Sequence, residues 1–217
     1  MDFSFLPEYY DYFLKGAQIT IYLSIVTVVL GVLLGILLAL MKMSEIKPFR
    51  WAATAYIEFI RGTPLLVQLF IIFYGLPQLS QFLEMPDFVA GALALSINSA
   101  AYVAEIFRAG IQAIDKGQME AARSLGMSKR MAMRHIILPQ AFKNILPALG
   151  NEFIVVIKES SIVMVIGIHE LMYNANVVKG AIYRPFEPLV AAAILYFILT
   201  FTLSKLLGVA ERRMRTE

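Results

Sequence analysis

Polar and ionisable side chains interrupt several long apolar stretches of this sequence, and their spacing is that of groups sharing one face of a helix. Asn98, Tyr102 and Glu105 recur at intervals of four and three residues. Ser99 lies beside them, and Glu159 precedes two serines in another apolar stretch. Carboxylates in such surroundings relay protons or bind cations, whereas amides and hydroxyls bind polar solutes. Both chemistries are open at this point.

Several other chemistries lack the residues that they require. The sequence has no cysteine, so disulfides, thiolate metal clusters and cysteine nucleophiles are excluded. His169-Glu170 lacks the second histidine of the H-E-x-x-H zinc motif, and His135 lies one predicted membrane span away. No histidine lies at a depth suited to activating Ser160 or Ser161, and no G-x-x-x-x-G-K-[ST] sequence is present to hold ATP phosphates. We expect no metal site, no cofactor and no catalysis by this chain.

The elements that must position these polar side chains are membrane helices. Of the 217 residues, 59% are hydrophobic and 16% charged, against about 45–50% and about 25% in soluble domains. Five stretches are apolar enough to span a bilayer, which takes about 20 residues. They lie between Lys15 and Lys42, Arg61 and Glu84, Asp87 and Glu105, Ile145 and His169, and Glu187 and Lys205. We predict one all-helical membrane domain over residues 1–217, with five transmembrane helices.

Basic residues indicate the orientation, because they collect on the cytoplasmic side of membrane proteins. Fourteen lie in the loop 42–50, the segment 108–143 and the C-terminal tail, whereas the opposite side carries only Lys15, Lys179 and Arg184. We predict an external N-terminus and a cytoplasmic C-terminus. This distribution explains the net charge of +3 without nucleic-acid binding. The first apolar run is too long for a signal-peptide core, so we expect no cleavage.

A stripe of small and polar residues on the first predicted span has two interpretations. It consists of Thr20, Ser24, Thr27, Gly31 and Gly35. Glycines four residues apart are typical of closely packed helices, so packing is favoured over solute contact for most of this stripe.

The fourth predicted span carries charges that need a bundle interior or an aqueous cavity. They are Glu152, Lys158 and Glu159. Lys158 either pairs with an acid or stays available, and a surplus of acids in and beside the spans predicts at least one carboxylate without a basic partner. Pro139 and Pro147 are expected to bound the passage into this span, because proline disrupts helix interiors.

The predicted cytoplasmic segment of about 112–140 has the pattern of a helix, a turn and a second helix. Asp115 and Gln118 have capping-box spacing. Gly126 suits the positive φ that ends a helix, and Ser128 suits the start of the next one. From periodicity alone, an amphipathic hairpin lying on the bilayer surface remains open.

The residues of this segment carry a family resemblance. Glu120-Ala121-Ala122, then Gly126 after three residues, then Ile136-Ile137-Leu138-Pro139 after nine more, resemble the EAA loop of ABC importer membrane subunits. Arg61-Gly62-Thr63-Pro64-Leu65 is similar to the branch of that family handling polar amino acids, the histidine, glutamine and arginine type. Asp115 and Ala109 stand where proline and glycine are common in such relatives, outside the core of the motif.

This resemblance implies a type I ABC importer permease of the bacterial inner (cell) membrane. Such a subunit dimerises, most simply with an identical copy, binds one cytoplasmic ATP-binding subunit per copy and receives solute from an extracytoplasmic binding protein. The hairpin would transmit motion of the ATPase subunit to the membrane helices. The residues expected to couple the two proteins are Glu120, Ala121, Ala122, Arg123, Leu125 and Gly126.

The expected function is ATP-driven import of polar amino acids by alternating access around a pocket at mid-membrane. Amides and hydroxyls suit the carboxylate of the solute and a buried acid suits its ammonium, and the acid surplus is compatible with basic amino acids. The expected solute-binding residues are Ser24, Asn98, Ser99, Tyr102, Glu159, Ser160 and Ser161. Two alternatives stay open, an ion-coupled carrier or channel with proton-relaying carboxylates and an intramembrane hydrolase, although neither needs a cytoplasmic docking hairpin.

Overall fold

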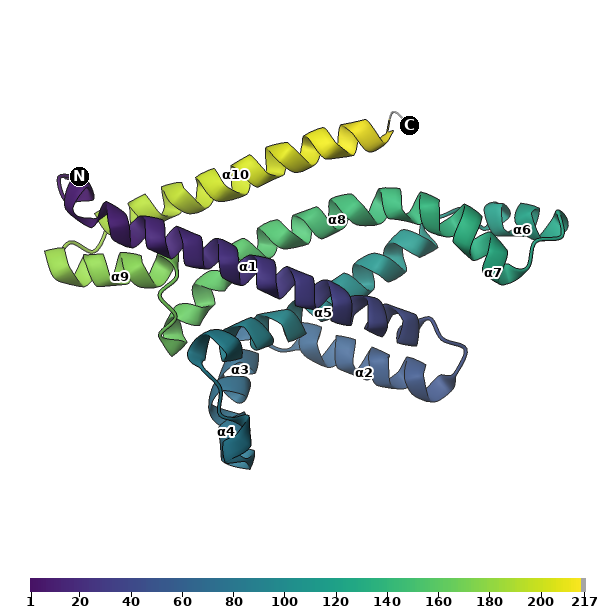
Figure 1. The fold of residues 1–217 in the computed structure, drawn as a ribbon, viewed down its shortest axis with the longest axis horizontal. Coiled ribbons are helices and arrows are strands. Elements are labelled where there is room, and N and C mark those ends of the chain that lie inside the picture. The colour runs from purple at the N-terminus through teal and green to yellow at the C-terminus, as the bar shows by residue number, and fades with distance from the viewer. Residues whose placement is uncertain (216–217) are drawn as a thin grey trace.

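A computed structural model describes residues 1–215, and every regular element in that range is helical, as predicted (Figure 1). The α-helices are α1 (Leu6–Lys42), α2 (Lys47–Gly62), α3 (Leu65–Phe70), α4 (Leu76–Leu79), α5 (Asp87–Gln112), α6 (Lys116–Ser124), α7 (Lys129–Ala132), α8 (Leu138–Glu159), α9 (Leu171–Ile182) and α10 (Glu187–Arg215). Shorter turns join some of them, namely the π-helical turns η1 (Ile71–Gly75) and η3 (Met133–Ile137) and the 3-10 turns η2 (Gln81–Leu83) and η4 (Ser160–Ile166).

Close packing between α1 and α5 forms the centre of the bundle (Figure 1). A Cβ atom added to Gly35 would lie 2.5 Å from Cγ1 of Val103, and one added to Gly31 would lie 3.0 Å from Oγ of Ser99. The first distance leaves no room for a methyl group, and the second would require Ser99 to shift by a few tenths of an ångström, so the two helices are in close contact at both glycines. The packing interpretation of the first-span stripe is confirmed at these two glycines.

The polar members of the same stripe are also buried, which places one expected solute contact away from any surface. Thr20, Ser24 and Thr27 have no exposed surface. Oγ of Ser24 donates to the carbonyl of Thr20 at 2.7 Å, and Oγ1 of Thr20 accepts from the amide of Leu171 at the start of α9. Within the described chain Ser24 therefore supports α1 and its packing rather than lining a cavity.

The second predicted span begins at a sharp bend. α2 and the segment Leu65–Leu79 meet at a bend of 108°. The backbone is extended at Thr63 and Pro64, and Pro64 has no N–H with which to continue α2. The stretch between Arg61 and Glu84 therefore contains the helical segment Leu65–Leu79, which is shorter than the predicted span, and α2 before the bend packs along α1 (Figure 1).

The fourth predicted span also differs from the structure. α8 begins at Leu138, ends at Glu159 and continues as the 3-10 turn η4, which Gly167 terminates with φ of 85°. Pro139 stands at the start of α8 as expected, but Pro147 lies inside the helix rather than at its boundary. The expected continuous span from Ile145 to His169 is therefore shorter and ends in a tightened turn.

Glu170 joins α1, α9 and α10 at the end of the bundle that holds the N-terminus. It is fully buried and caps α9 by accepting hydrogen bonds from the amides of Met172 and Tyr173. The hydroxyl of Tyr196 on α10 donates to it at 2.6 Å. The role of Glu170 as a helix cap was not predicted from the sequence.

Three described helices are long and apolar enough to cross a membrane by themselves, namely Leu6–Lys42, Asp87–Gln112 and Glu187–Arg212. The bent pair of α2 with α3 and α4 counts as a fourth if it is one span. The chain is thus a membrane protein whose interior contains broken helices as well as continuous ones.

Replacing Gly35 with alanine should destabilise the protein, because the new methyl group would press on Val103 across the α1–α5 contact. We expect a cost of about 1–3 kcal/mol, typical of overpacked sites. Gly208→Ala is the matched control, since nothing lies within 4 Å of its added Cβ and both positions are helical. Thermal unfolding in detergent measures the difference, and equal midpoints for the two variants would contradict it.

Candidate functional site

A buried amide pair holds the bend between α2 and α3 against the middle of α5. Nε2 of Gln68 donates to the carbonyl of Ile60 at 2.7 Å, and to the carbonyl and hydroxyl oxygens of Thr63 at 3.1 and 2.9 Å. Oε1 of Gln68 accepts from Nδ2 of Asn98 at 3.0 Å. Asn98 and Gln68 are each 5% exposed. One glutamine side chain thus occupies backbone acceptors that the broken helix leaves free and fixes the break to α5.

The neighbouring position on α5 faces α8 instead. Oγ of Ser99 donates to Oε1 of Glu152 at 2.7 Å, and both residues are buried. Among the described residues Glu152 forms no ion pair within 4 Å. Glu159, which is half-buried and lies seven residues further along α8, forms none either. The expectation of carboxylates without a basic partner is therefore confirmed in this part of the chain.

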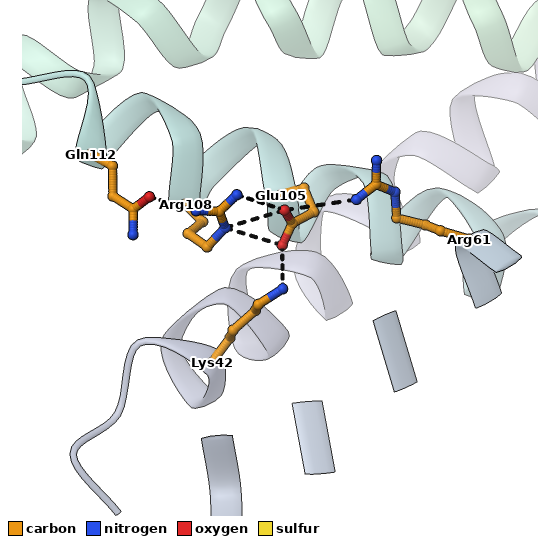
Figure 2. A network of polar contacts seen from close by, with 5 residues as sticks. All are labelled: Lys42, Arg61, Glu105, Arg108 and Gln112. Atoms are coloured by element: carbon orange, nitrogen blue, oxygen red, sulfur yellow. Dashed lines mark hydrogen bonds and ion pairs between the residues drawn. The ribbon is translucent and has the colours of Figure 1, made fainter. Parts of the chain in front are cut away.

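A charged network lies one and two turns further along α5 (Figure 2). Glu105 accepts from Nζ of Lys42 at 2.7 Å and from Nη2 of Arg108 at 2.8 Å. Nη1 of Arg61 lies 3.7 Å from the same carboxylate, and its guanidinium lies over the ring of Tyr102 at 5.4 Å. The network ties the end of α1 and the end of α2 to α5.

The structure brings some of the predicted solute residues together and separates others. Asn98, Ser99 and Tyr102 share α5, and Glu152 joins Ser99 from α8. The hydroxyls of Ser160 and Ser161 donate to carbonyls one turn earlier, those of Ile157 and Lys158, at 2.8 Å. These two serines therefore complete the transition from α8 into η4 as well as standing beside Glu159.

Gln68 is a site residue that was not predicted, and Glu152 was predicted only as a charge of the fourth span. Gln68 is an isolated amide in an apolar stretch five residues after Thr63, and an isolated polar residue of that kind is the signal that could have revealed it. Lys158 is exposed and forms no ion pair with a described residue, so the predicted alternative of internal pairing with an acid is absent from this part of the chain.

The hairpin formed by α6 and α7 has the predicted local structure. Oδ1 of Asp115 accepts from the amide of Gly117 at the start of α6, and Oγ of Ser128 accepts from the amide of Met131 at the start of α7. Gly126 has φ of 85° between them. Gln118 is a correction, because its Oε1 accepts from Nε2 of Gln140 instead of closing the capping box.

The predicted coupling residues present one mostly exposed surface on α6. Ala122 is buried against the rest of the hairpin, whereas Leu125 is 84% exposed. The remaining members, Glu120, Ala121, Arg123 and Gly126, are exposed.

Two contacts hold this hairpin in place. Nη1 of Arg123 donates to the carbonyl of Met127 and so braces the turn. Nζ of Lys129 donates to Glu45, in the turn between α1 and α2, at 2.8 Å, and this hydrogen bond lowers the pKa of the Glu45 carboxyl. Among the described residues no group of three histidine, aspartate or glutamate side chains could hold a metal ion.

The comparison with known proteins agrees with this geometry. A family model described as "Binding-protein-dependent transport system inner membrane component" matches residues 31–216. The chain belongs to that family. It is 45% identical over 216 residues to the arginine transport system permease protein ArtQ of Bacillus subtilis, covering 100% of this chain and 98% of that relative. It is 40% identical over 214 residues to the probable glutamine ABC transporter permease protein GlnM of the same organism, covering 99% and 98%.

Solved structures show the same fold. A chain from the crystal structure of an amino acid ABC transporter with histidines is 56% identical, has a TM-score of 0.94 and covers 98% of this chain and 99% of its own length. A chain of the MetNI methionine ABC transporter in an inward-facing conformation is 18% identical, with a TM-score of 0.77 and coverage of 93% and 95%, which shows the fold alone. The protein is thus a permease subunit of the amino-acid ABC importer family, with the type I importer fold, and the carrier, channel and hydrolase alternatives lose their support.

Replacing Gln68 with methionine should destabilise the bend, because it leaves the Asn98 amide and the Ile60 carbonyl without a partner. Each buried polar group left unpaired costs about 1–3 kcal/mol. Gln78→Met, the same change at an exposed position of α4, is the control. Thermal unfolding of the purified protein should show a clear loss for the first variant only, and a similar small effect of both would argue against the bracing role.

Proposed function

We propose that the chain forms the translocation pathway of an importer of polar amino acids, with basic ones among its solutes. The observation that carries this proposal is the pair of carboxylates on α8, Glu152 and Glu159, which have no ion-pair partner among the described residues. A buried acid in that state favours a cationic ligand. The name of the 45% identical relative, an arginine transport permease, supports the same solute class.

The proposed topology has five spans, an external N-terminus and a cytoplasmic C-terminus. α1, the bent pair of α2 with α3 and α4, α5, α8 and α10 are the spans, and α6 with α7 is the cytoplasmic hairpin. The excess of basic residues in the loop 42–50 and the segment 108–143 supports this orientation. The family description, an inner membrane component, supports the bacterial inner membrane as the location.

The proposed complex contains two permease subunits, one cytoplasmic ATP-binding subunit per permease and an extracytoplasmic binding protein. The sequence has no phosphate-binding loop of its own, so the free energy of ATP hydrolysis has to enter from a partner. The exposed surface of α6 offers a docking site, with Ala121 and Gly126 allowing close approach and Glu120 and Arg123 available for polar contacts at its rim. We take the second permease subunit to be an identical copy, and residues 1–217 to form a single domain.

Solute would pass the middle of α5 by alternating access. Asn98 and Ser99 point to opposite neighbours there, toward Gln68 and toward Glu152. Tyr102 is 38% exposed one turn away and Glu159 is half-buried at the end of α8. These groups combine hydrogen-bond donors with unpaired carboxylates, which is the chemistry that a zwitterion with a basic side chain requires.

Replacing Gly126 with valine should uncouple ATP hydrolysis from solute. The added Cβ meets nothing within 4 Å, so the penalty comes from φ of 85°, which a β-branched residue adopts poorly. Gly126→Asn is the matched control, because asparagine tolerates that conformation. In reconstituted vesicles with the ATPase subunit and binding protein, solute-stimulated hydrolysis should fall several-fold for valine and stay near wild type for asparagine. Unchanged stimulation in the valine variant would remove the docking role.

Replacing Glu159 with glutamine should weaken any preference for cationic solutes, because it removes one unpaired negative charge. Competition by arginine, glutamine and glutamate against labelled arginine measures the preference. Glu58→Gln, at an exposed acid on α2, is the control. If glutamate competes best in wild type, or if the preference survives Glu159→Gln unchanged, the assignment of this pocket is wrong while the importer family stands. Uptake that follows a proton gradient and ignores ATP would instead restore the ion-coupled alternative.

A further inference from the structure

Arg61 is a charged side chain that the single chain leaves partly exposed beside Tyr102 of α5. It stands in the last turn of α2, which starts at Lys47 in the proposed cytoplasmic loop. Its guanidinium lies 3.7 Å from Glu105, which also binds Lys42 and Arg108, so the charge stands toward the proposed cytoplasmic end of α5. Its side chain is nevertheless 45% exposed in the single chain. A partly exposed guanidinium in a membrane bundle faces a protein interface, a water-filled pathway or the aqueous surface, since charges facing lipid are strongly disfavoured. The position over Tyr102, a proposed solute residue, favours the pathway.

The charge balance around Arg61 leaves its guanidinium without a full partner. Glu105 already accepts short hydrogen bonds from Lys42 and Arg108, at 2.7 and 2.8 Å. Arg61 lies 3.7 Å from the same carboxylate, beyond hydrogen-bond distance, and donates no side-chain hydrogen bond to any described residue. One carboxylate therefore faces three cations, and the excess positive charge resides on the most exposed of them (Figure 2).

The neighbours of Arg61 fix its direction without using its donors. Its guanidinium lies 5.4 Å from the ring centroid of Tyr102, a cation–π arrangement that holds the charged plane in place. Tyr102 is itself 38% exposed, and Asn98 lies one turn before it on α5. Glu58, one turn earlier on α2, makes no ion pair with Arg61 within 4 Å. The N–H groups of the Arg61 guanidinium are thus held in one direction, are partly exposed, and donate no hydrogen bond to a described residue.

We propose that Arg61 binds the α-carboxylate of the amino acid during its passage, with Tyr102 as the platform beneath the guanidinium and Glu105 as a positioning residue. This inference rests on the proposed function and names the group that recognises the solute's negative end. A guanidinium fork matches a carboxylate in two parallel hydrogen bonds, a geometry that a lysine does not reproduce. The unpaired carboxylates of α8 are then left for the positive groups of the solute.

The test compares a carboxylate ligand with its uncharged amide. The full-length protein in nanodiscs, without binding protein, is titrated with L-arginine and L-argininamide, which differ only at the carboxyl group. Wild type should prefer arginine, and Arg61→Gln should weaken arginine binding about 10- to 100-fold, the effect of losing hydrogen bonds to a charged group. Binding of argininamide should stay within about twofold, because it never used the fork. Arg61→Lys should recover only part of the arginine affinity.

A second variant tests whether a weaker binding of arginine by Arg61→Gln comes from misfolding or from the loss of any nearby positive charge. Lys158 is another exposed cation beside the proposed pocket, and Lys158→Gln should leave the preference for arginine over argininamide intact. A loss of both ligands in Arg61→Gln would mean that Arg61 only holds α2 to α5, and a preference lost in Lys158→Gln instead would move the carboxylate site to α8. Either result overturns the role of Arg61 and leaves the proposed function standing. If wild type binds arginine no better than an unrelated amine, both proposals fall.

Discussion

Every backbone polar group inside a bilayer has to find a partner within the protein, and the arrangement of this chain follows from how that requirement is met where helices break. The break between α2 and α3 exposes carbonyl groups that the Gln68 amide occupies. The start of α9 exposes amide groups that Glu170 and Thr20 occupy. Each repair uses a buried side chain that also contacts another helix, so satisfying the backbone and fixing the tertiary structure are the same event.

Around these repairs, α5 collects the functional groups because it is packed on several sides. Close approach to α1 at Gly31 and Gly35 buries one face. The polar faces that remain are directed at α2 and α3 on one side and at α8 on the other, through Asn98 and Ser99. A single helix thus presents an amide donor to one neighbour and a hydroxyl donor to an unpaired carboxylate of the other. Polar side chains of this kind persist in a membrane interior only when such contacts satisfy them.

The sequence was most informative where structure is local. Asp115, Gly126 and Ser128 determine the hairpin through caps and a positive φ within a few residues, and all three behave as predicted. Contacts between residues far apart in the sequence were harder to predict. Hydropathy could not reveal that Gln68 stabilises a bend near Thr63, because one of its hydrogen-bond partners lies 30 residues away in the sequence and meets it only in the folded chain. Ser24 and Asn98 are both polar residues in apolar helices, and the sequence does not distinguish their roles. Only the packing of the folded chain shows that Ser24 is enclosed by α1 and its neighbours, whereas Asn98 lies beside the break between α2 and α3.

The short connections of the hairpin have a mechanical consequence. Only three residues separate α5 from α6, and α7 continues through η3 into α8 without a loop. A Cβ on Gly110 of α5 would lie 2.4 Å from Ile145 of α8, so the two long helices also touch just behind the hairpin. A load applied at α6 therefore cannot be absorbed by a slack tether and has little room to pry α5 from α8. Such a load would move both helices together, with the Ser99–Glu152 hydrogen bond between them, and would change access without rearranging the interior that they share.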